Sequence, residues 1–194
     1  MTSKKYNMGF TSSGLLVRES QLLAERYLEL NDWKVVRSEA VEKNLFRSRT
    51  PETAKRIARE VVLRLKELDL QELEKVVHGR DDEIRQLLWV AVCRRYQFIA
   101  DFAREVLHEH FLQFKPEITE DDYQVFFNRK AAWHEELEQL SRISEAKIKQ
   151  VLFRMMREAG LLDGENRIIP TLFSDDIRRL TANIPNQLEL FATR

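Results

Sequence analysis

The sequence predicts a mostly α-helical protein, with a helix-turn-helix-like unit near its N-terminus and a winged-helix-like unit with a small β-hairpin near its C-terminus. Only five glycines and four prolines interrupt 194 residues, and the apolar residues between them recur at helical spacing. Apolar residues make up 43% of the chain, enough for a core. We expect one compact protein made of an N-terminal unit (1–68), a central helical core (69–115) and a C-terminal unit with its tail (116–194).

The zero net charge of the chain is an average over blocks of opposite sign. Residues 31–66 contain ten Lys/Arg and five Asp/Glu, and residues 142–160 contain five and two. The blocks 67–86 and 116–141 are acidic. Because attraction to phosphate depends on the local charge of a face, a neutral protein can carry two polyanion-binding faces. Nucleic acid is therefore the leading candidate partner.

Three helices are predicted in the N-terminal unit. The hydroxyl run 11–13 is expected to cap a helix over about 14–30, and Asp32 is expected to cap a second helix that ends near Asn44. The third helix should begin at Pro51, because proline fits a first helical turn.

The third helix has two distinct sides. Its apolar residues from Ala54 to Leu68 keep to one stripe, and basic residues lie opposite. A basic outer side after an Arg-rich loop is typical of a recognition helix that enters the major groove. The alternative is a solvated surface helix, whose charge Glu52 and Glu60 dilute. The candidate DNA contacts in this unit are Arg47, Arg49, Lys55, Arg56, Arg59 and Lys66.

The middle of the chain is interpreted as structural. A short helix over 70–77 should stop at Gly79, and the dense apolar residues over 84–114 predict the central core in one or two helices. We expect Arg94 and Arg95 in this segment to pair with acidic residues. Contact with a ligand is the alternative.

The C-terminal unit is predicted to open with a helix capped by Thr119, with Asp122 three positions on. A further helix over 131–140 should contain Trp133 and Leu137, which are both apolar.

A second two-sided helix is predicted over 145–159, with Ser144 as its cap. Residues 161–170 should form two short strands around an Asp-Gly turn, so that the helix and hairpin resemble a winged helix. Such a wing would bring a basic side chain to a phosphate or the minor groove. The alternative is a winged helix used for protein contacts. The candidate contacts here are Lys147, Gln150, Arg154, Arg157 and, in the wing, Arg167.

No catalytic or metal site is predicted. His108 and His110 lie about 200° apart on a helix and cannot share a metal. The chain lacks a Gly-rich phosphate loop and a Gly-x-Ser-x-Gly elbow. We therefore expect no enzyme activity, no cofactor and no small-molecule substrate.

The sequence also predicts a cytoplasmic protein without a membrane span. Its longest apolar run, 87–93, has seven residues, against roughly 20 needed to cross a bilayer. No apolar stretch follows the N-terminal lysines, as a secretory signal requires. The single cysteine, Cys93, excludes an intramolecular disulfide and favours a reducing compartment.

Four strings of the sequence resemble a known family. They are KYNMGFTSSGLL (5–16), LWVAVCRRYQFIADF (88–102), FNRKAAWHEEL (127–137) and VLFRMMREAGLL (151–162). The likeness is to the BrxA family of bacterial BREX (bacteriophage exclusion) defence systems, and it runs from Lys5 to about Thr171. It implies a small, mostly helical, non-enzymatic protein that binds double-stranded DNA with little sequence preference, beside separate methyltransferase, ATPase and phosphatase-like components.

Two polar segments of these strings have no expected core role. Asn128, Arg129 and Lys130 lie between apolar neighbours, and Arg129 and Lys130 are candidate contacts with phosphate or with a protein partner. The segment over 4–7 is expected to be an arm along DNA or a disordered terminus.

The function predicted from the sequence is binding of double-stranded DNA within a BREX phage-defence assembly, with possible contacts to other BREX proteins. One alternative is an adaptor whose basic faces meet acidic partner proteins. Another is an RNA binder, which a looser structural likeness to NusB-type antitermination proteins would imply.

Overall fold

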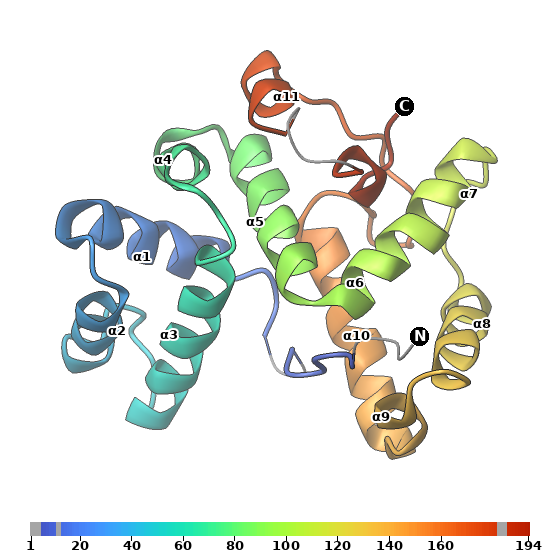
Figure 1. Ribbon diagram of the computed structural model, residues 1–194, viewed down its shortest axis with the longest axis horizontal. Helices are drawn as coiled ribbons and strands as arrows, with labels where there is room; N and C mark the ends of the chain where they lie inside the picture. The colour runs from blue at the N-terminus through green and yellow to red at the C-terminus, as the bar shows by residue number, and fades with distance from the viewer. Residues whose placement is uncertain (1–4, 11–12, 182–185) are drawn as a thin grey trace. The chain divides into compact units, whose positions relative to one another are not determined.

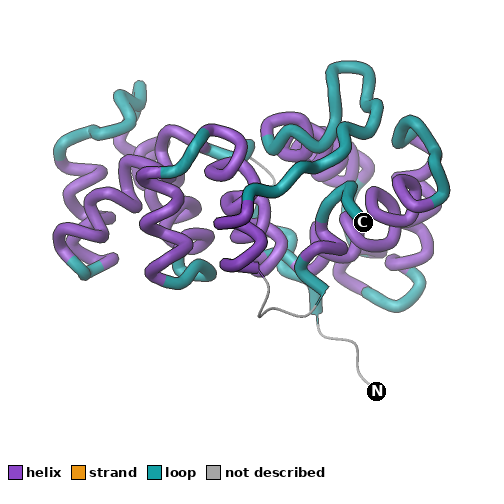
Figure 2. Tube along the Cα trace, turned by 90° about the horizontal axis from the view of Figure 1, so that it is seen from above, coloured by secondary structure: helices purple, strands orange, loops and turns teal. Residues whose placement is uncertain are grey.

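The structure, a computed structural model, describes residues 5–10, 13–181 and 186–194. These residues form helices and loops and contain no strand, so the prediction of a mostly α fold is confirmed (Figures 1 and 2). They divide into two compact units. One is residues 15–95, here called the inner unit because in the sequence it lies between the two segments of the other. The other, the outer unit, joins the chain up to Gly14 to residues 96–194.

The units differ from the three segments expected from the sequence. The expected central core, 69–115, is shared between them, because its first half packs on the N-terminal helices. Its second half belongs with the C-terminal residues.

The inner unit contains five helices. They are α1 (Val17–Leu30), α2 (Trp33–Glu42), α3 (Pro51–Leu65), α4 (Leu70–His78) and α5 (Asp81–Arg95). Helix α1 contacts all four others, and both α3 and α4 pack on α5 (Figure 1). The side chains at these contacts, among them Leu23, Val36 and Trp89, are fully buried.

Two of the three expected N-caps in the inner unit are confirmed. The Asp32 carboxylate accepts a hydrogen bond from Lys34 N at 2.7 Å, and the Thr50 hydroxyl accepts one from Thr53 N at 3.2 Å. The expected cap of α1 is wrong. Its N-cap residue is Leu16, with φ 59° and no side-chain hydrogen bond, so α1 begins after the hydroxyl run. Ser13 is buried, and residues 11–12 lie outside the described chain.

The predicted pairing of Arg94 is confirmed. Its guanidinium donates two hydrogen bonds of 2.7 Å to the Glu72 carboxylate and one of 2.8 Å to the Glu67 carbonyl. Glu72 is fully buried and also accepts from Asp69 N at 2.9 Å in a capping box. Arg95 lies 3.8 Å from the Glu67 carboxylate. The Arg94–Glu72 ion pair joins α4 to α5, and removing one partner of such a buried pair typically costs about 3–5 kcal/mol.

Most helices of the outer unit are short. The helices are α6 (Gln97–Phe102), the π-helical η1 (Ala103–His108), α7 (Glu109–Leu112), α8 (Glu120–Ala131), α9 (Glu135–Glu138), α10 (Arg142–Glu158), α11 (Asp175–Thr181) and the 3-10 turn η2 (Leu188–Leu190). The exceptions in length are α8 with 12 residues and α10 with 17. The helical run breaks at Tyr96, which is extended and 1% exposed. The core of the outer unit is aromatic, with Phe98 and Phe102 each packed edge-on to Phe126.

The N-terminal segment is part of this core. Tyr6 is 5% exposed, and its hydroxyl donates to Asp101 at 2.6 Å. Its ring stacks on His134 with centroids 3.9 Å apart, and its backbone N–H donates to Glu136 at 2.5 Å. Burial, reinforced by Asp101, raises the pKa of Tyr6. For residues 5–7 the expectation of a free arm or a disordered terminus is therefore wrong; residue 4 lies outside the described chain.

The helix starts in the outer unit match the sequence in part. Thr119 and Asp122 form the expected capping box. Ser144 is not a cap, because Ser141 accepts its N–H at 3.2 Å and α10 begins three residues earlier. The helix expected over 131–140 is reduced to α9, in which Leu137 is 1% exposed. Trp133 lies before α9 and is 81% exposed.

The predicted β-hairpin is not confirmed. Residues 161–169 turn back through one antiparallel bridge, Leu162 to Ile168, and form no strand. The Asp163 carboxylate accepts from the N–H groups of Glu165 and Arg167, which closes the turn tightly. The returning chain then bonds to the loop before α8, where Ile168 N donates to Pro116 O at 2.8 Å. The winged-helix assignment is accordingly not confirmed either.

Stability of the inner unit should depend on pH through Glu39 of α2. Hydrogen bonds from Lys43 at 2.7 Å and from Arg26 of α1 at 2.6 Å lower the pKa of Glu39. A lowered pKa adds stability that is present above the unfolded value, about 4.3, and is lost as pH falls through the folded value. We expect Glu39→Gln to reduce the loss of thermal stability below about pH 4.3, measured by circular dichroism melts. Identical acid sensitivity of the two proteins would contradict this role.

Candidate nucleic-acid interface

The α3 basic face consists of Lys55, Arg56, Arg59 and Lys66. All four side chains are exposed, while Ala58, Val61 and Leu65 on the opposite side are fully buried. The predicted division of this helix into an apolar and a basic side is confirmed. Full burial of a Val or Leu side chain contributes about 1.5–3 kcal/mol, so the helix cannot turn its basic side inward.

The charges of the α3 basic face are not neutralised by neighbours. None of its four cations makes an ion pair within the described chain. Glu60, which the sequence suggested would dilute the face, instead accepts a hydrogen bond of 2.8 Å from Arg64, whose side chain is 3% exposed. Glu52 remains as an exposed acid in the first turn.

The loop before α3 adds two further cations. Arg47 and Arg49 are exposed and make no ion pair among the residues that the structure describes. The side-chain amide of Asn44 makes two hydrogen bonds to the backbone of Ser48 in this loop. Its oxygen accepts from Ser48 N at 2.8 Å, and its nitrogen donates to Ser48 O at 3.0 Å. The loop is thus ordered by a side chain that carries no charge.

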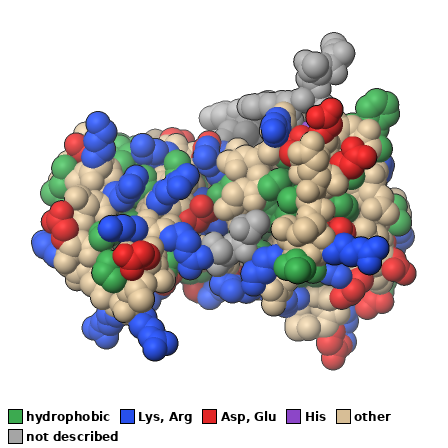
Figure 3. Space-filling view, turned by 90° about the horizontal axis from the view of Figure 1, so that it is seen from below, with side chains coloured by type: hydrophobic (Ala, Val, Ile, Leu, Met, Phe, Trp, Pro, Cys, Tyr) green, Lys and Arg blue, Asp and Glu red, His purple; other side chains and the backbone are tan. Residues whose placement is uncertain are grey.

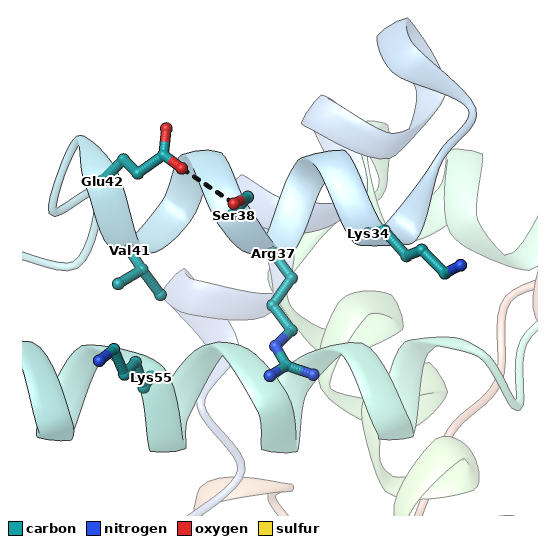
Figure 4. A pocket seen from close by; sticks show the side chains of 6 residues that line it. All are labelled: Lys34, Arg37, Ser38, Val41, Glu42 and Lys55. Atoms are coloured by element: carbon teal, nitrogen blue, oxygen red, sulfur yellow. Dashed lines mark hydrogen bonds between the residues drawn. The ribbon is translucent and has the colours of Figure 1, made fainter.

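Helix α2 contributes two cations that the sequence interpretation missed, Lys34 and Arg37. Both are exposed, and both line a groove of about 480 Å³ between α2 and α3. Figure 4 shows Arg37 and Val41 extending from α2 toward α3, which carries Lys55. Lys34 and Arg37 are three residues apart and so share one face of α2, and this spacing could have identified them from the sequence. Figure 3 shows Lys and Arg side chains spread over the side of the inner unit where α2 and α3 lie, with few acids among them.

The cations of α10 are arranged differently. Arg154 is hydrogen-bonded to Glu158 at 2.9 Å, and Arg157 donates to Asn166 at 2.8 Å. Lys147 donates to Gln150 at 3.0 Å, so these two candidates remain exposed but bond to each other. The apolar side of the helix is buried as predicted.

The remaining candidates in the outer unit have acidic partners, as Arg154 does. Arg167 lies 2.7 Å from Asp163 and 3.1 Å from Glu165, and its hydrogen bonds lower the pKa of Asp163. Arg129 pairs with Glu105 at 2.6 Å. Lys130 pairs with Glu105 at 2.5 Å and with Asp101 at 3.2 Å. These three cations are therefore compensated within the unit.

No metal site forms in the described chain, where no three His, Cys, Asp or Glu side chains converge. His108 lies 2.9 Å from the Phe191 carbonyl and His110 lies 3.3 Å from that of Glu117, so each imidazole contacts the backbone. No described helix is long and apolar enough to cross a membrane.

Comparison with known proteins identifies the family. The BrxA family profile matches residues 4–183. The chain belongs to the BrxA family. A curated BrxA relative, the BREX protein BrxA of Escherichia coli O9:H4 (strain HS), is 32% identical over 153 residues, 79% of this chain and 72% of the relative. The BREX protein BrxA of Bacillus cereus (strain H3081.97) is 28% identical over 151 residues, 76% of each chain.

A solved structure shares the fold seen in this BrxA family member. The crystal structure of an uncharacterized protein from Magnetospirillum magneticum superposes with a TM-score of 0.81 at 17% identity, over 97% of this chain and 100% of that one. The family places the chain in BREX phage-defence systems, as the sequence resemblance predicted.

The α3 basic face should be dispensable for folding. We expect Lys55→Glu/Arg59→Glu/Lys66→Glu to change the free energy of unfolding by less than about 1.5 kcal/mol, because exposed substitutions outside special contacts change it by about 0.5 kcal/mol each. Urea unfolding followed by circular dichroism measures this. A loss above about 3 kcal/mol would show that these side chains hold the inner unit together.

Proposed function

We propose that the protein binds double-stranded DNA, largely independently of sequence, as a non-enzymatic component of a BREX system. The observation that carries this proposal is the set of uncompensated cations on α3, the loop before it and α2. Such cations gain free energy when phosphates replace their counterions. They have no acidic partner in the described chain that a phosphate must first displace.

The geometry supports the DNA backbone as the target. Cations spread over a helix, a loop and a groove can contact several phosphates along a duplex. Phosphate contacts carry no information about the base sequence. Helix α3 presents its basic side as a recognition helix does, with the preceding loop at its N-terminal end.

In this proposal the outer unit makes a secondary contact. Lys147 and Gln150 of α10 are exposed, and the turn over 163–167 takes the place of a wing. A phosphate there must compete with the pairs of Arg154 and Arg167 to their own carboxylates. We therefore assign most of the affinity to the inner unit.

A matched pair of charge-reversed variants tests this assignment. Mobility shifts with a duplex of about 25 base pairs give the affinity of wild type, of Lys55→Glu/Arg59→Glu/Lys66→Glu and of Lys147→Glu/Arg154→Glu/Arg157→Glu. For wild type, about five neutralised phosphates give a slope of log affinity against log salt near −4.5. We expect the α3 variant to lose about three units of this slope, and the α10 variant less than one.

The same measurement separates the alternatives. Equal slopes for the α3 variant and wild type would contradict the proposal. Tighter binding of structured RNA than of duplex DNA would favour an RNA binder. If the α3 variant keeps its DNA affinity but no longer co-purifies with other BREX proteins, the face is an adaptor surface.

A further inference from the structure

The part of the outer unit around α9, here called the α9 corner, exposes three large apolar side chains: Val125, Trp133 and Ile143. Their exposed fractions are 67%, 81% and 84%. Helix α8 contacts α9, and the Gln124 side chain of α8 donates a hydrogen bond of 2.9 Å to Glu145 in the first turn of α10 (Figure 1). The three apolar side chains therefore come from neighbouring elements. A group of exposed apolar residues, unlike a single one, marks an interaction site.

Acids without a partner lie on the same elements. Glu135 and Glu138 of α9 and Asp121 of α8 are exposed and make no ion pair within the described chain. Arg142 is exposed and offsets one of these charges, whereas Arg129 is already paired with an acid of η1. The α9 corner therefore combines apolar surface with excess negative charge.

The tryptophan of the corner lies on a rigid support. His134, which follows it in the chain, is 7% exposed and stacks on the buried Tyr6 ring. The Glu136 carboxylate accepts the Tyr6 N–H. A large aromatic side chain on a backbone held in this way loses little entropy on binding. Trp133 is thus the expected anchor, because tryptophans supply much of the binding energy of protein interfaces.

The charge of the α9 corner selects its partner. Excess negative charge repels DNA and the anionic surface of a membrane, and it attracts Lys and Arg side chains. A guanidinium or ammonium group also gains attraction over the face of an indole ring, and its aliphatic stem packs on apolar neighbours. A segment rich in Lys and Arg therefore complements both the charge and the apolar surface of the corner.

We propose that the α9 corner is the docking site for a Lys- and Arg-rich segment of another protein of the same BREX system. The source of the segment follows from the family, which places this chain among the components of such a system. A cation of the partner covers the Trp133 ring, and the aliphatic stems of the segment contact Val125 and Ile143. Glu135 and Glu138 face its neighbouring charges.

This site goes beyond the proposed function and does not rest on it. The cations assigned to DNA lie mainly on α2, on α3 and in the loop between them, and none of them belongs to the α9 corner. A chain with both sites can join a duplex to a second BREX protein.

Biolayer interferometry without DNA tests the docking. The full chain is immobilised, and each other protein encoded by the same BREX system is purified and applied singly. At least one of them should bind wild type. We expect Trp133→Ala to weaken this binding at least about 30-fold through faster dissociation, because a buried anchor sets the lifetime of a complex. Glu135→Lys/Glu138→Lys should slow association at least about 10-fold at low salt and make it less sensitive to salt, because charges at the rim steer the encounter.

Two control variants carry matched changes elsewhere. Leu172→Ala truncates an apolar side chain of the outer unit that is 83% exposed. Glu25→Lys/Glu74→Lys reverses two exposed glutamates of α1 and α4 that make no ion pair within the described chain. Both variants should bind as wild type does. Trp133→Ala should keep the thermal stability and the DNA affinity of wild type, so loss of docking and loss of DNA binding are separate results.

Four results would overturn the proposal. The first is failure of every other protein of the system to bind wild type, and the second is binding that Trp133→Ala leaves unchanged. The third is binding that Glu135→Lys/Glu138→Lys strengthens, which would show that the corner meets an acidic partner. The fourth is equal weakening by Glu25→Lys/Glu74→Lys, which would show attraction to the charge of the whole chain rather than to the corner.

Discussion

Packing of the apolar side of α3 against the neighbouring helices determines where the exposed cations of this helix lie. Ala58, Val61 and Leu65 are fully buried against the neighbouring helices, and truncating a buried leucine to alanine typically costs about 2–5 kcal/mol. The helix is therefore fixed in rotation, and Lys55, Arg59 and Lys66 must face solvent. The Arg94–Glu72 pair holds α5, on which α3 packs, against α4.

The two basic helices differ in how many of their cations have an acidic partner, although Lys147 and Arg157 of α10 bond to the uncharged Gln150 and Asn166. Both α3 and α10 bury an apolar side and expose a basic one. On α10, Arg154 is hydrogen-bonded to Glu158, and beyond it Arg167 is held by Asp163. On α3, the one acid within the helix that forms a close pair bonds inward to Arg64. A phosphate that approaches α3 would gain attraction without breaking an existing ion pair, and for this reason the proposed function assigns polyanion binding mainly to the inner unit.

Much of the fold follows from local sequence signals. The period of α3, its Thr50 cap and Pro51, and the Thr119–Asp122 capping box were predictable because they depend on residues within one turn. The extent of the turn after α10 was not, because its partner is the distant Pro116 carbonyl. The division into units escaped prediction for the same reason, since Tyr6 finds Asp101 and His134 only after the chain has folded back. For the candidate interface, the residue types could be predicted from the sequence, but their ion pairs could not. Lys130 is a residue type that commonly contacts phosphate, yet in the structure it pairs with Asp101 and Glu105.

Lysine footprinting tests the central claim most directly. Wild-type protein, free and bound to duplex DNA, is acetylated briefly, and the modified lysines are quantified by mass spectrometry. Duplex should protect Lys55, Lys66 and Lys34, and should leave Lys147 and Lys43 nearly as reactive as in the free protein. Protection of Lys147 with Lys55 and Lys66 fully reactive would contradict the assignment of DNA binding to the inner unit.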